Sequence, residues 1–192
     1  MTNTKDDEVK NSILEAAKRV FQKWGLNKTS MEDIAHEAGK GKSTLYYYFK
    51  SKDEILEVVV KNELNNIMNK VKSATTDLIS SKEKLKRYLS TLLVEINKSV
   101  SIYPILTGEV KGNVEFLSRM SKIVKDREEA VILDILKEGL ESGEFNFFSE
   151  DEIDKAASVI VGIIMGLSMY LFFDNDDSEM IGIAARLIAD GG

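Results

Sequence analysis

Proline is almost absent from this chain, and its scarcity restricts the fold more than any other feature of the sequence. Pro104 is the only proline among 192 residues, so little interrupts a backbone rich in helix formers such as Leu, Lys and Glu. Apolar residues recur at spacings of three and four along most of the chain, which is the period of a helix buried on one side. No segment alternates as a strand does. The sequence therefore predicts an all-α fold of about nine helices.

Capping residues and helix breakers locate the ends of these helices. Serine precedes an acidic residue by three positions, a pattern typical of a helix N-terminus, at places that include Ser30, Ser51 and Ser149. Glycine follows three apolar stretches and is expected to end their helices: Gly25, Gly39 and Gly143. Pro104 fits the first turn of a helix. We expect helices over 5–24, 31–38, 42–49, 52–71, 82–101, 104–112, 114–141, 150–173 and 177–189.

Charge is distributed unevenly along the chain. The formal net charge is −6, yet residues 1–52 carry ten basic and seven acidic side chains, whereas the remainder carries 16 and 25. Between Lys40 and Lys52 there are four lysines and no acid. A basic N-terminal segment on an acidic body is typical of a protein that meets phosphate groups with one end only.

Residues 29–52 have the pattern of a helix-turn-helix. The helix after Ser30 has a small apolar face, which suits a helix that braces another one: Ile34, Ala35 and Ala38. After the turn at Gly39, Leu45 and Phe49 lie four residues apart and are expected to point inward. Tyr46 is expected to face the core as well. The outer positions then carry the donors that a helix in the major groove requires: Lys42, Ser43, Thr44, Tyr47 and Tyr48.

The stretch from Ile13 to Leu56 resembles the DNA-binding domain of the TetR family of transcriptional regulators. The resemblance covers about a quarter of the chain and is carried by Ala16-Ala17, Phe21, Gly25, Thr29-Ser30, Asp33-Ile34-Ala35, Ala38-Gly39, Thr44 to Phe49 and Lys52. It implies that Lys42, Ser43, Tyr47 and Tyr48 face DNA. It also implies that a second group contacts the DNA backbone or frames the fold: Thr29, Ser30, Tyr46 and Lys52.

The sequence departs from the family pattern at one place. Lys40-Gly41 stands where the family usually has an apolar residue followed by Ser. Gly41 can begin a helix without a side-chain cap, and Lys40 becomes a further predicted phosphate contact. We expect residues 1–52 to form the helix-turn-helix DNA-binding domain and residues 53–192 a helical effector-binding and dimerisation domain.

An uncharged run from Ala156 to Phe173 indicates a dimer interface. Its 18 residues touch the lower limit for a membrane span, but its flanks are acidic and lack basic anchors on one side. A helix that is apolar all round can also be buried between its own domain and a partner. A G-x-x-x-G spacing allows close helix approach, and the last helix would complete a four-helix bundle. The predicted interface comprises Ile160, Gly162, Ile163, Gly166, Met169, Ile181, Ala184, Ala185 and Ile188.

The family resemblance also implies a small-molecule effector held between helices of the second domain. The available chemistry there is apolar and aromatic, which suits a hydrophobic ligand. The predicted ligand-binding residues are Tyr88, Tyr103, Leu106, Phe116, Met120, Met165, Met169 and Phe172. Each of them could equally be ordinary core.

Several other functions are disfavoured by the sequence. The chain has no cysteine and only one histidine, His36, so neither thiol chemistry nor a histidine-based metal site is expected. Gly41-Lys42-Ser43 is similar to the end of a phosphate-binding loop, but His36 stands where that loop needs its first glycine. The acidic stretch 174–179 lacks the glycine and glutamate of a calcium loop. We expect no enzyme activity, no cofactor and, because the first residues lack a secretory signal, a cytoplasmic location.

Taken with the basic segment, the resemblance predicts a ligand-responsive transcriptional repressor. A homodimer would bind a palindromic operator, and a small hydrophobic effector would release it. Two alternatives stay open at this stage: an activator with the same DNA-binding head, and a helical adaptor that binds protein. The adaptor would lack the steep salt dependence that counterion release imposes on DNA binding.

Overall fold

A computed structural model describes residues 4–102, 114–173 and 178–190 of the chain. The described residues form eight α-helices and one short 3-10 turn, with no strand among them. This confirms the predicted all-α class. The predicted helix 104–112, with Pro104, lies outside the described residues. The chain divides into two units, residues 1–66 with 100–113 and residues 67–99 with 114–192. This division falls inside a helix, and the functional boundary predicted at 52–53 stays a prediction.

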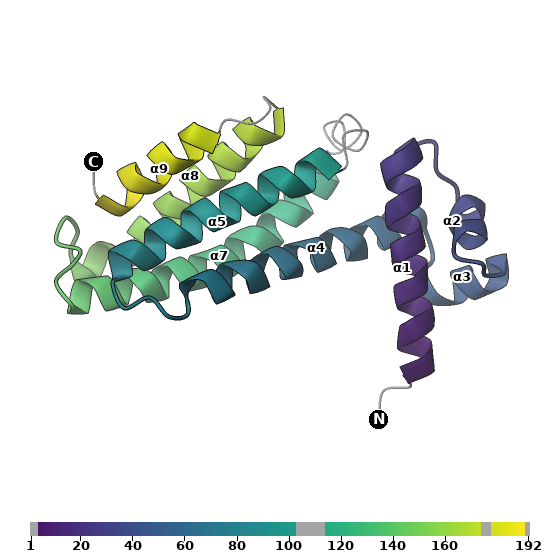
Figure 1. Ribbon diagram of the computed structural model, residues 1–192, viewed down its shortest axis with the longest axis horizontal. Coiled ribbons are helices and arrows are strands. Elements are labelled where there is room, and N and C mark those ends of the chain that lie inside the picture. Colours follow the sequence, from purple (N-terminus) through teal and green to yellow (C-terminus); the bar gives the residue numbers. More distant parts are fainter. Residues whose placement is uncertain (1–3, 103–113, 174–177, 191–192) are drawn as a thin grey trace. The chain divides into compact units, whose positions relative to one another are not determined.

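The first unit is built from three helices and the beginning of a fourth (Figure 1): α1 Thr4–Trp24, α2 Met31–Glu37, α3 Lys42–Tyr48 and α4 Lys52–Thr75. Its apolar side chains are buried at the spacings that the sequence predicts, among them Ile13, Phe21, Ile34, Leu45, Phe49 and Ile55. Trp24 is an exception, because its ring is half-exposed and Lys23 Nζ lies 4.8 Å from the ring centroid. Leu45 and Phe49 therefore anchor α3 by its inner face, as predicted.

Local hydrogen bonds define the ends of the short helices. Ser30 Oγ accepts from the Asp33 amide at 3.1 Å, and Asp33 Oδ2 accepts from the Ser30 amide at 2.8 Å, which completes the capping box of α2. The turn into α3 passes through Gly39 at φ 62°, a left-handed conformation that favours glycine. At the start of α4, the capping pattern predicted from Ser51 is only half formed. Ser51 Oγ caps the Glu54 amide, but the Glu54 carboxylate accepts from the Lys50 amide.

The second unit is a helical bundle of α5 Ser81–Ile102 up to residue 99, α7 Val114–Glu141, α8 Ile153–Phe173, α9 Ser178–Asp190 and the end of α4 (Figure 1). A single large core joins these helices, with buried residues that include Val71, Leu89, Leu92, Leu136, Val161, Ile164 and Ala185. A smaller cluster links α5, α8 and α9 through Leu93, Leu171 and Ile181. The predicted ranges of α5, α7 and α9 agree with the observed bounds to within one residue.

The connection from α7 to α8 is bound to the start of α5. Gly139 lies against the Phe145 ring so closely that a Cβ atom there would overlap it. The Glu144 carboxylate accepts from Ser80 Oγ and from the amides of Ser81 and Lys82, and so caps α5. The predicted capping box of Ser149 and Glu152 is present, but it begins the 3-10 turn Glu150–Glu152 that precedes α8.

No helix among the described residues combines the length and apolar character that crossing a bilayer demands. The run 156–173 makes up most of α8, Ile153–Phe173. In the bundle, that run supplies buried residues to the core.

Candidate nucleic-acid interface

Helix α3 presents several polar side chains on the surface of the first unit. Lys42, Ser43, Tyr46 and Tyr47 are exposed, with Tyr47 77% exposed, whereas Thr44 and Tyr48 are half-buried. The expectation that Tyr46 faces the core is wrong, because its ring is 45% exposed. Position 46 lies about 100° around the helix from Leu45, and the inner face of α3 is already filled. The exposed side of α3 thus carries hydroxyl and amino donors together with two aromatic rings.

Lys42, the first residue of α3, is held by a carboxylate from the preceding helix. Its Nζ forms an ion pair with Glu32 of α2 and lies 5.8 Å from the centroid of the Tyr46 ring. The hydrogen bond from Lys42 holds the pKa of Glu32 below its ordinary value. The same bond raises the pKa of Lys42. Both side chains remain more than half exposed, so this pair lies on the surface that α3 offers.

The last residue of α3 is held in a similar way. Tyr48 Oη donates to Asp6 Oδ1 of α1 at 2.9 Å, and the rings of Tyr47 and Tyr48 meet edge to face with centroids 4.9 Å apart. The hydroxyl of Tyr48 is therefore already engaged within the unit. The ring of Tyr47 extends farther into solvent than any other large apolar side chain of α3.

Three residues of the predicted DNA-binding set frame the fold. Thr29 is 2% exposed, and its Oγ1 donates to the Gly25 carbonyl at 2.5 Å. Ser30 caps α2. The Lys52 ammonium donates to the carbonyls of Leu26 and Thr29 at 2.7 and 2.9 Å, with Asn27 at 3.4 Å. Lys40 is half-buried at the turn before α3. Contact of any of these residues with DNA stays a prediction, and the burial of Thr29 speaks against it.

The second unit contains a buried polar pair, Tyr88 and Glu128, of which only Tyr88 was among the predicted ligand-binding residues. Tyr88 of α5 is 1% exposed and donates a hydrogen bond from its hydroxyl to the Glu128 carboxylate of α7, which is 2% exposed. Burial raises the pKa of Glu128 and also that of the Tyr88 phenol. Glu128 precedes the core residue Ile132 by four positions and Leu136 by eight, so the apolar spacing of α7 already placed it on the buried face.

The other predicted ligand-binding residues are only partly described. Met165 packs against the large core. Tyr103 and Leu106 lie outside the described residues. The side chains of four further candidates also lie outside what is described, although their backbones belong to α7 and α8: Phe116, Met120, Met169 and Phe172. Whether any of the predicted set binds a ligand stays a prediction.

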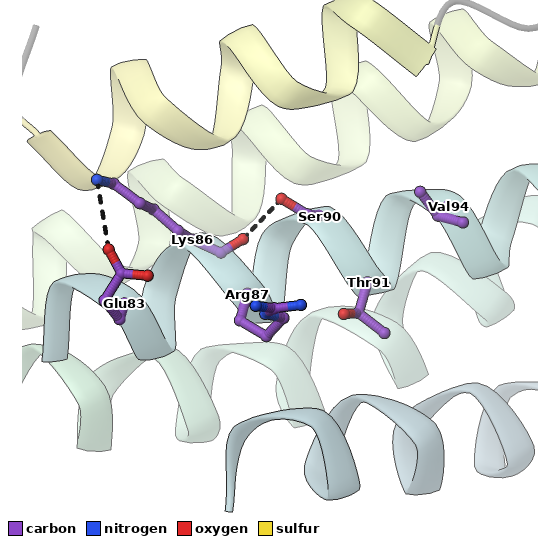
Figure 2. Close-up of a pocket in the computed structure, with 6 residues that line it drawn as sticks. All are labelled: Glu83, Lys86, Arg87, Ser90, Thr91 and Val94. Atoms are coloured by element: carbon purple, nitrogen blue, oxygen red, sulfur yellow. Dashed lines mark hydrogen bonds and ion pairs between the residues drawn. The ribbon is translucent and has the colours of Figure 1, made fainter. Parts of the chain in front are cut away.

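An open groove of about 360 Å³ lies along α5, and none of the predicted ligand residues is among those that line it. Its lining is polar apart from one valine: Glu83, Lys86, Arg87, Ser90, Thr91 and Val94. Figure 2 shows Lys86 reaching toward Glu83, 3.7 Å away, and Ser90 Oγ donating to the Lys86 carbonyl. Lys86 also pairs with Asp190 of α9 at 2.9 Å. This groove does not have the apolar lining expected for a hydrophobic effector.

Several residues of the predicted dimer face pack within their own chain, and their part in a dimer interface stays a prediction. Ile160, Ile181 and Ala185 are buried in the core of their own chain, and Ile188 packs against it. Ala184 is half-buried, whereas Gly162, Ile163 and Gly166 are exposed. Among the side chains that the structure describes, the large apolar ones exposed on α8 and α9 are Val159, Ile163, Tyr170, Ile183 and Leu187. A helix that is apolar all round gives no sequence signal for which face turns inward.

Comparisons with known proteins agree with this architecture. Residues 13–59 match the family model described as bacterial regulatory proteins, tetR family. The chain is 28% identical over 134 residues to the fatty acid metabolism regulator protein of Bacillus subtilis, covering 69% of this chain and 68% of that protein. Its fold is similar to that of a transcriptional regulator from Cytophaga hutchinsonii, with a TM-score of 0.76, 22% identity and coverage of 93% and 95%. It is also similar to FadR from Bacillus subtilis in complex with stearoyl-CoA, with a TM-score of 0.70, 22% identity and coverage of 94% and 98%.

Proposed function

Because the chain belongs to the TetR family of bacterial transcriptional regulators, we propose that it is a ligand-responsive repressor that binds a palindromic operator as a homodimer. The observation that carries the proposal is the exposed side of α3, where Lys42, Ser43 and Tyr47 project from a helix anchored by buried Leu45 and Phe49. A helix fixed by one face and lined with donors on the other suits the major groove.

Dimerisation through α8 and α9 is supported by the apolar side chains that these helices leave exposed. We name this set the α8–α9 face: Val159, Gly162, Ile163, Gly166, Tyr170, Ile183 and Leu187. A Cβ at Gly162 or Gly166 would meet nothing within 4 Å in its own chain, so both positions leave room for a second helix to approach closely. An apolar face on two adjacent helices fits a two-fold interface. Two copies of α3 would then be about 34–36 Å apart, one turn of DNA.

The proposed effector is a small hydrophobic molecule bound in the second unit. Two similar proteins support an acyl compound as the first to test, since one is named as a regulator of fatty acid metabolism and the other is a complex with stearoyl-CoA. Release would follow if the ligand favours a state in which α4 is displaced. This helix begins four residues after α3 ends, and its residues belong to both units.

The decisive experiment selects preferred sequences from a pool of random duplexes with the purified chain. We expect a palindromic site with half-site centres about 10 base pairs apart, an affinity that falls steeply with salt, and a complex of two chains per site. Lys42→Ala should weaken binding, whereas Lys137→Ala, an exposed lysine of the second unit, should not. Stearoyl-CoA, added at increasing concentration, tests the effector class. Failure to enrich any sequence, together with salt-independent capture of protein, would favour the adaptor instead.

Repression and activation are separated by a reporter gene. With the selected site placed over a promoter, the chain should lower expression, and effector should restore it. A rise in expression from a site upstream of the promoter would identify an activator that uses the same head.

A further inference from the structure

A carboxylate from the neighbouring helix lies beside the first residue of α3. The first turn of α3 has no acid of its own, and residues 38–52 contain none. Glu32, from the neighbouring helix α2, nevertheless reaches Lys42 and pairs with its ammonium. The one lysine of α3 is thus already paired with a carboxylate in the free protein.

Capping of α2 does not explain the presence of this carboxylate. The capping box of α2 is already complete, because Ser30 and Asp33 satisfy each other's amides. Asp33 also supplies negative charge in the first turn of α2. Glu32 adds to that charge, but its side chain extends to the next helix, where Lys42 lies between the carboxylate and the Tyr46 ring.

We propose that Glu32 lowers the affinity of the chain for DNA by competing with phosphate for Lys42. The inference rests on the proposed function, since it requires that Lys42 meets DNA. A phosphate that approaches Lys42 must either displace the carboxylate or accept its repulsion. Glu32 therefore sets how tightly the reading helix holds DNA of any sequence, without contacting a base.

The expected size of the effect follows from the exposure of the pair. Exposed ion pairs contribute little, so Glu32→Gln should tighten binding by about two- to fivefold at low salt. The gain should shrink as salt rises from 50 to 300 mM, because a shorter Debye length screens the repulsion between the Glu32 carboxylate and nearby phosphates. A glutamine keeps the size and helix position of the side chain while it removes the charge.

The test is a double-mutant cycle measured by fluorescence anisotropy with a random-sequence duplex of 30 base pairs and with the selected operator. Wild type, Glu32→Gln, Lys42→Met and the double variant are compared, and far-UV circular dichroism verifies that each is folded. The matched control is Glu37→Gln, which removes the same charge from the other end of α2, where Glu37 pairs with Arg19 at 2.6 Å. We expect tightening from Glu32→Gln alone, and about none of it in the Lys42→Met background.

Each contrary outcome has a distinct meaning. Equal tightening with and without Lys42, or equal tightening from Glu37→Gln, would show general repulsion and overturn the inference. A Glu32→Gln chain that binds as wild type does, while Lys42→Met weakens binding, would also overturn it but leave the proposed function standing. No DNA binding by the wild type would remove both.

Discussion

Replacement of Tyr88 by Phe removes one oxygen atom from the centre of the second unit and leaves the Glu128 carboxyl without its phenol partner. Because Glu128 is 2% exposed, water does not replace the lost hydrogen bond. An unsatisfied buried polar group costs about 1–3 kcal/mol, and the missing oxygen adds almost no cavity. We therefore expect the free energy of unfolding to fall by about 1–3 kcal/mol at neutral pH.

The pH dependence of this loss makes the prediction specific. Burial raises the pKa of Glu128 above its ordinary value of 4.5, whereas the bond from Tyr88 lowers it. A carboxyl whose folded pKa is raised stabilises the chain fully below 4.5 and loses that contribution as pH rises through the folded pKa. Without Tyr88 the folded pKa rises further, so the variant should lose more stability at pH 8 than at pH 4.5.

Urea unfolding followed by far-UV circular dichroism at pH 4.5, 6 and 8 measures this difference, at one protomer concentration because dimerisation affects stability. The control is Glu128→Gln, which keeps an acceptor for Tyr88 and removes the charge. Its stability should vary less over the same pH range than that of the wild type. A Tyr88→Phe chain that is equally destabilised at all three pH values would refute the reasoning, as would a Glu128→Gln chain with an unchanged pH profile.

Three further substitutions test other parts of the structure. Gly139→Ala forces a methyl group into the Phe145 ring, so it should destabilise the chain by about 1–3 kcal/mol in urea unfolding, and Phe145→Leu should relieve part of this cost. Ile163→Asp puts a charge on the α8–α9 face and should yield monomers by analytical ultracentrifugation, whereas an Asp at exposed Ile79 should not. Tyr47→Ala should weaken operator binding while the dimer survives, and unchanged affinity would exclude Tyr47 from the DNA contact.

Local patterns predicted the helices well, because their ends depend on neighbours in sequence. The capping box of Ser30 and Asp33 and the inward positions of Leu45 and Phe49 follow from spacing alone. The orientation of Tyr46 was predicted wrongly, because helical periodicity alone does not determine whether a residue at the edge of the buried face of a short helix packs into the core. Which side of α3 is buried depends on the helices that pack against it, and the seven-residue sequence of α3 does not identify those helices.

Contacts between distant segments could not be predicted. Lys52 binds carbonyls more than 20 residues earlier in the chain, and Glu32 reaches Lys42 across a turn. The family resemblance left open whether Lys52 frames the fold or contacts DNA, and no local pattern identifies the partner of either side chain. On α8, Ile160 and Ile163 are chemically alike, yet one is buried and the other exposed. Only the packing of the bundle decides between them.

The ammonium of Lys52 has a mechanical consequence for the first unit. It fastens the first residue of α4 to the loop that joins α1 and α2, through carbonyls at both ends of that loop. The segment that contains α2 and α3 therefore has both of its ends, the α1–α2 loop and the first residue of α4, joined by these hydrogen bonds. We therefore expect a displacement of the first residue of α4 to be passed on to the α1–α2 loop as well as to α3.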